Sequence, residues 1–164
     1  MNIFKRISLW FKSQFYADKK TQTYFAIPAS TVRSYFATYT SHYNIKISDR
    51  QYARVKKDWL LHGYYNYFIK VLSGLSIGDW EEKYDCDNFA ELYKAVVQAC
   101  HNISSVEIEG IAVGIVWYRT DAGTGHAVNT AIVNDDEIIF IEPQTGRQIE
   151  LSPTEVHSIC FVLF

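Results

Sequence analysis

The sequence predicts an α+β fold in which helices come first and an antiparallel sheet follows. Up to about residue 105, apolar residues recur at helical spacing, as they do between Cys86 and Val97. Beyond that point, short apolar runs alternate with turn-forming residues, which is typical of strands that follow one another along the chain. No internal repeat or low-complexity linker divides the 164 residues, so we expect one domain over 1–164.

The spacing of apolar residues predicts four helices, over 3–16, from Ser30 or Thr31 onward, over 48–72 and over 86–100. The first lies in an amphipathic N-terminal segment, 1–20, with Trp10 and Phe11 on one side and basic residues elsewhere. Such a helix either packs on its own domain or lies on a membrane surface or a partner.

The second part of the chain predicts five strands within 111–164. They cover residues 111–118, 126–133, 137–143, 147–151 and 158–164. Turn residues separate the middle three: Asn134 to Asp136 form one loop, and the segment PQTG forms the next.

Composition excludes several classes of protein. The net charge is −2, which argues against a nucleic-acid binder. Three cysteines without a CxxC pair form neither a disulfide framework nor a zinc site, so a reducing compartment is expected. No stretch is long enough to span a bilayer, and the first residues lack the features of a signal peptide. We therefore expect a cytoplasmic protein, or one delivered without a secretion signal.

Cys86 stands between two aspartates at the start of the predicted helix 86–100. Asp85 is a good N-cap, which places the thiol near free backbone N–H groups and the positive end of the helix dipole. Both features favour a nucleophilic thiolate, whereas Asp85 and Asp87 raise the pKa of the thiol, so a cation would be needed. The alternative is that Cys86 is a small buried apolar residue.

His126 is the best candidate for that cation, because it follows a glycine-rich loop and opens an apolar strand. Glu142 ends the next strand, and Gln144 follows two residues later. If the intervening loop has three residues, Val128 lies opposite Glu142, which is then diagonal to His126 on the same face. A two-residue loop would turn Glu142 to the other face.

The motifs DCDNFA, GHAVN and FIEPQTG resemble the papain-like cysteine peptidases. They also resemble the C-terminal catalytic domain of fungal lectins of the Marasmius oreades agglutinin type, over about residues 48–150. The resemblance implies N-terminal helices packed on a C-terminal antiparallel sheet. It also implies a Cys86–His126–Glu142 triad, with Gln144 as the alternative orienting residue, that cleaves amide bonds through a thioester.

Two alternatives remain open. One is a peptidoglycan peptidase of a phage or bacterium, because the DC-plus-helix start also resembles the NlpC/P60 hydrolases. The other is a noncatalytic module of the same fold that binds a partner through its tyrosines. The ligand would accordingly be a polypeptide or peptidoglycan. No cofactor is required by the sequence, and calcium is a candidate with Asp85 and Asp87 as ligands.

Overall fold

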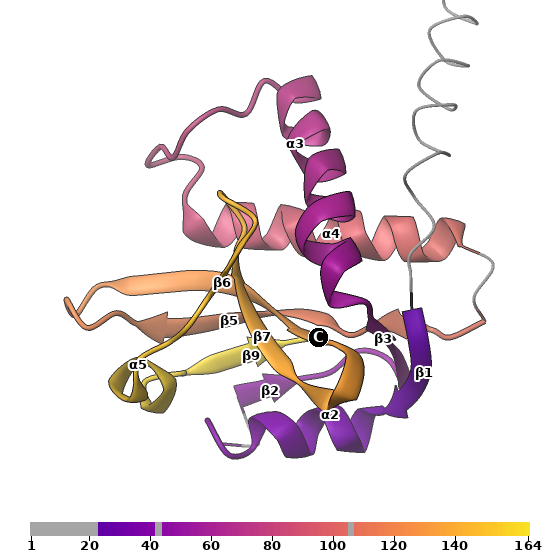
Figure 1. Cartoon of the computed structure of the whole chain (residues 1–164). Helices are drawn as coiled ribbons and strands as arrows, with labels where there is room; N and C mark the ends of the chain where they lie inside the picture. The colour runs from indigo at the N-terminus through magenta and orange to yellow at the C-terminus, as the bar shows by residue number, and fades with distance from the viewer. Residues whose placement is uncertain (1–22, 42–43, 105–106) are drawn as a thin grey trace, which may run out of the picture.

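The computed structural model of the protein consists of two β-sheets with helices packed around them (Figure 1). The structure describes residues 23–41, 44–104 and 107–164, so the expected helix 3–16 lies outside the described residues. The strands are β1 (Thr23–Pro28), β2 (Ile45–Lys46), β3 (Gln51–Val55), β4 (Gly110–Ile111), β5 (Val113–Arg119), β6 (Gly125–Ile132), β7 (Ile138–Glu142), β8 (Arg147–Ile149) and β9 (Phe161–Leu163). The α-helices are α2 (Ala29–Phe36), α3 (Tyr65–Gly74), α4 (Cys86–Ile103) and α5 (Pro153–His157). A π-helical turn, η2 (Trp59–Tyr64), precedes α3, and a 3-10 turn, η3 (Asn134–Asp136), joins β6 to β7.

The predicted papain-like α+β arrangement, with N-terminal helices on a C-terminal antiparallel sheet, is wrong. The described residues form a mostly β fold with nine strands and four α-helices. One sheet has the order β1-β3-β4, and the other has the order β2-β9-β5-β6-β7-β8. Three strands come from the part of the chain that was expected to be helical, and β3 and β2 pair in parallel with β4 and β9. Strands from the N-terminal part therefore complete both sheets.

The long helix expected over 48–72 is the main local error. Residues 51–55 form β3, which lies between β1 and β4, and the helical part begins only at η2. Tyr52 and Val55, which suggested one side of a helix, are both buried in the strand. Their spacing is compatible with either structure, and the backbone pairing with β1 and β4 decides the outcome.

The helix expected from Cys86 onward is confirmed as α4. Its buried residues, Phe89, Ala90, Tyr93, Val97 and Cys100, recur at helical spacing. The helix is held on the sheet by Asn129 of β6, whose buried Nδ2 donates to the carbonyl oxygens of Ala90 and Gly114 at 3.0 and 3.1 Å. The start of α4 is therefore fixed relative to β5 and β6.

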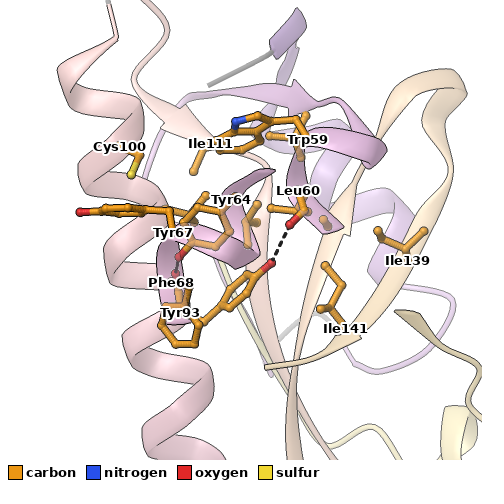
Figure 2. Packing of buried hydrophobic residues seen from close by; sticks show 14 of the residues in the cluster. Trp59, Leu60, Tyr64, Tyr67, Phe68, Tyr93, Cys100, Ile111, Ile139 and Ile141 are labelled. Atoms are coloured by element: carbon orange, nitrogen blue, oxygen red, sulfur yellow. Dashed lines mark hydrogen bonds between the residues drawn. The ribbon is translucent and has the colours of Figure 1, made fainter. Parts of the chain in front are cut away.

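An aromatic cluster joins α3 and η2 to α4 (Figure 2). The Tyr64 hydroxyl donates to the carbonyl oxygen of Tyr93 at 2.6 Å, and the two rings meet edge to face. Phe68 packs edge to face on Tyr93 with ring centroids 5.1 Å apart. Several of the tyrosines that suggested an interface are therefore buried in the core.

Candidate functional site

The first turn of α4 positions Cys86. Asp85 is the N-cap, as predicted, and its backbone N–H donates to Oδ1 of Asn88 at 3.2 Å. The Tyr84 ring packs edge to face on Phe89, which fixes the chain where it enters the helix. Cys86 is the first helical residue and is partly buried.

The start of β6 positions His126. The three-residue turn Asn134–Asp136 joins β6 to β7, the Val133 N–H donates to the Glu137 carbonyl oxygen at 2.9 Å, and Asn129 pairs with Ile141, which is the register that the sequence analysis required. Continuing this register puts Val128 opposite Glu142. His126 Nε2 lies 2.9 Å from Glu142 Oε2. The predicted proximity of these two side chains is therefore observed.

Gln144 does not take the place of Glu142. Its backbone N–H donates to Glu142 Oε1 at 3.2 Å, so Gln144 helps to hold the carboxylate that contacts His126. The ring of His126 also packs edge to face on Tyr118. Among the described residues, the Nδ1 atom of His126 has no hydrogen-bond partner, so that nitrogen is available to a ligand.

Cys86 and His126 line one groove with a volume of about 370 Å³. Its other lining residues are Asp85, Asp87, Trp117, Tyr118, Arg119, Gly125 and Cys160. The structure thus brings the predicted thiol and imidazole to the same cavity. Glu142 supports the groove from behind through His126.

The electrostatics of Cys86 differ from those of an activated thiolate. Burial raises the pKa of the Cys86 thiol, and the carboxylates of Asp85 and Asp87 raise it further. The backbone N–H groups of Ala127 and Asp87 lower the pKa, but they do not reverse the shift. This environment therefore disfavours the thiolate that was expected at the helix start.

Asp85 and Asp87 interact with each other. A hydrogen bond to the Asp85 side chain raises the pKa of Asp87, and burial adds to that effect. The described residues contain no group of three or more His, Cys, Asp or Glu side chains arranged to hold a metal ion. Calcium takes roughly six to eight oxygen ligands, so Asp85 and Asp87 would supply only part of a calcium site, and that site stays a prediction.

Sequence reasoning missed four residues that line the groove: Trp117, Tyr118, Arg119 and Cys160. Cys160 lies in the apolar run 158–164, yet it is exposed, and its thiol donates to the carbonyl oxygen of Trp117 at 3.4 Å. It reaches the groove because β9 pairs with β5 and not with its sequence neighbour β8. For Trp117 and Arg119 the one available signal was their position near the end of β5, where Trp117 is partly buried and Arg119 is exposed.

A second cavity of about 530 Å³ is lined mostly by α3 and the loop 77–80. Phe89 and Gln144 line it together with Trp80, whose side chain is 52% exposed.

The comparisons with known proteins found one family model and several solved structures that are similar to this chain. A family model described as "Agglutinin C-terminal" matches residues 71–148, which include the start of α4, His126 and Glu142. No curated protein matches the chain.

Two solved structures are similar to the fold. One is the Polyporus squamosus lectin bound to the human-type influenza-binding epitope Neu5Aca2-6Galb1-4GlcNAc, with 19% identity and a TM-score of 0.63 over 85% of this chain. The other is a PSL1a–E64 complex, with 21% identity and a TM-score of 0.61 over 85% of this chain. The chain covers 49% and 51% of those two chains, so it spans about half the length of the structures that it matches.

These findings contradict the prediction of a cysteine hydrolase. The matched family and the first matched structure are described as an agglutinin and a lectin, not as a peptidase. The same findings contradict the peptidoglycan peptidase alternative and agree better with a noncatalytic binding module. They do not test which residues form the site, so Cys86, His126, Glu142 and Gln144 remain candidate site residues.

Among the described residues, no helix is both long and apolar enough to cross a membrane.

Proposed function

We propose that the chain is a noncatalytic binding module that holds a carbohydrate in the groove beside Cys86 and His126. The observation that carries this proposal is the groove itself, in which an indole and several polar side chains converge beside the Cys86 thiol. Burial and the carboxylates of Asp85 and Asp87 raise the pKa of that thiol and so disfavour the nucleophilic thiolate, which suits the groove better to holding a ligand than to attacking one.

The lining of the groove supports a polar ligand with apolar patches. Trp117 is partly buried, and its ring packs edge to face on Phe161, which holds the indole in one orientation. Ligand pockets typically combine aromatic surface with a few well-placed polar groups. Arg119 offers cationic hydrogen-bond donors, the Asp87 carboxyl group offers acceptor oxygens, and His126 Nδ1 can hydrogen-bond to a ligand. A sugar presents hydroxyl groups together with apolar C–H faces, and it matches such a lining.

The matched structures supply the first ligands to test. The Polyporus squamosus lectin is bound to a sialylated trisaccharide, and PSL1a is in complex with E64. The trisaccharide carries a carboxylate, which Arg119 could pair with at the edge of the groove. Because this chain covers about half of the lectin, its own binding of that trisaccharide is part of the proposal.

The proposal is tested by calorimetric titration of the full chain with Neu5Aca2-6Galb1-4GlcNAc. Arg119 is exposed, so Arg119→Ala should fold normally and weaken binding about tenfold, or roughly 1.4 kcal/mol. The matched control is Arg50→Ala, an exposed arginine that pairs with Glu109 and does not line the groove, and its affinity should be unchanged.

Two results would contradict this function. One is the absence of any heat or chemical-shift response to the trisaccharide and to a panel of neutral and acidic glycans. The other is cleavage of a polypeptide such as casein that is lost in Cys86→Ala, because a binding module does not turn its ligand over.

A further inference from the structure

A cavity apart from the groove lies between η2, the first turn of α3 and the β7–β8 turn. It has a volume of about 460 Å³. Its lining residues are Leu61, His62, Tyr65, Asn66, Thr145, Gly146, Arg147 and Gln148. None of them lines the Cys86 groove or the Trp80 cavity. The cavity is therefore a separate place where a ligand can sit.

The frame of this cavity is held in place by Tyr65. Its hydroxyl donates to the carbonyl oxygen of Gln144 at 2.7 Å, which joins α3 to the β7–β8 turn. Gly146 has a positive φ of 67°, and its Cα lies against the Tyr65 ring so closely that a Cβ would be 2.2 Å from the ring. The ring and the turn thus fit against each other only with glycine at this position. A preformed frame of this kind lowers the entropic cost of binding.

The polar side chains that line the cavity supply many hydrogen-bond donors. Arg147 and His62 supply cationic or potentially cationic groups, and Asn66 and Gln148 supply amides. The nearest acidic side chain to His62 is Asp58, with Nε2 and Oδ1 3.7 Å apart, and both side chains are largely exposed. An exposed pair of that length holds its partners only weakly. His62 is consequently held only weakly, and together with the exposed Arg147 it gives the cavity two groups that can meet an anion.

The backbone at the cavity also departs from regular structure. Residues Trp59–Tyr64 form a π-helical turn, which includes Leu61 and His62 of the cavity wall. Turns of this kind are rare and occur frequently at functional sites. This observation is independent of the polar lining and points to the same place.

We infer that this cavity, between η2 and the β7–β8 turn, is a second binding site that takes a sugar acid. The Arg147 guanidinium pairs with the carboxylate, for which its planar fork is well matched. The amides of Asn66 and Gln148 and the hydroxyl of Thr145 bind the hydroxyl groups of the sugar. The inference stands on this cavity alone and does not require a ligand in the Cys86 groove.

The test is an NMR titration of the full, isotope-labelled chain with D-glucuronate and, separately, with D-glucose. The two sugars differ only in the carboxylate, so glucuronate should shift the backbone amides of residues 61–66 and 144–148, whereas glucose should shift them far less. Arg147→Ala should weaken glucuronate binding about tenfold, and Arg147→Lys should restore only part of the loss. Arg147 is exposed, so neither variant should unfold the chain.

Arg119→Ala serves to separate the two sites, because it alters the groove without touching the hydrogen bonds that join His126, Glu142 and Gln144, and it should leave glucuronate binding unchanged. Three results would overturn the inference: no shift at these amides, equal shifts with glucose, or shifts confined to Gly125, His126 and their neighbours. The last result would place the sugar acid in the groove, and so would support the proposed function while refuting this second site.

Discussion

Replacing Gly146 by alanine should destabilise the protein by about 3 kcal/mol or more. Two costs add at this position. The positive φ of 67° is unfavourable for alanine, and the new Cβ would lie 2.2 Å from the Tyr65 ring, which cannot move without breaking its hydrogen bond to Gln144. The change should be measured as the free energy of unfolding in urea.

Gly123 provides a matched control for this prediction. It also has a positive φ, 83°, but no atom lies within 4 Å of the position its Cβ would take. Gly123→Ala should therefore cost only about 1 kcal/mol, the backbone part of the effect. Equal losses for the two variants would show that the contact between Tyr65 and the β7–β8 turn is not tight.

Replacing Asn129 by aspartate should cost about 3–5 kcal/mol at neutral pH. Asn129 is fully buried, and its amide donates to two carbonyl oxygens that a carboxylate would repel. The new carboxyl should be protonated in the folded state, with a pKa raised above its unfolded value near 4. Because the unfolded chain then loses its proton first, the stability of the variant should fall as pH rises above about 4.

Asn129→Ala separates the charge from the lost contacts. It removes the same two hydrogen bonds and leaves a small cavity, so its cost should be about 2 kcal/mol and should not change with pH. Thermal unfolding of both variants at pH 4 and pH 7 makes the comparison. A loss in the aspartate variant that does not depend on pH would contradict the account of how α4 is held on the sheet.

Local sequence signals predicted the parts of the site that depend on one element. Helix α4 was predicted from the helical spacing of its apolar residues and from Asp85 as its N-cap, because both signals depend only on residues within or next to the helix. The pairing of β6 with β7 followed from the length of one loop, and with it the proximity of His126 and Glu142. These features depend on residues that are close in the chain.

The features that depend on distant segments could not be predicted in the same way. Strand β3 forms because β1 and β4 flank it, and β4 is more than 50 residues further along the chain. Cys160 reaches the groove because β9 inserts between β2 and β5, whereas the sequence suggested a sheet of successive strands. The pKa of Cys86 depends on a balance between burial and the backbone N–H groups, and the amount of burial is a property of the whole fold.

The central claim, that the groove binds and does not catalyse, is tested most directly by the pH dependence of Cys86 alkylation. The chain and its His126→Ala variant are treated with iodoacetamide, and the modified peptides are quantified by mass spectrometry, with buried Cys100 and exposed Cys160 as internal references. The raised pKa predicts that Cys86 reacts with a midpoint above about 8.5, the value of an ordinary thiol, and that the variant behaves alike. Rapid alkylation of Cys86 well below that pH, lost in His126→Ala, would contradict the claim, because it would show a thiolate held by an imidazolium.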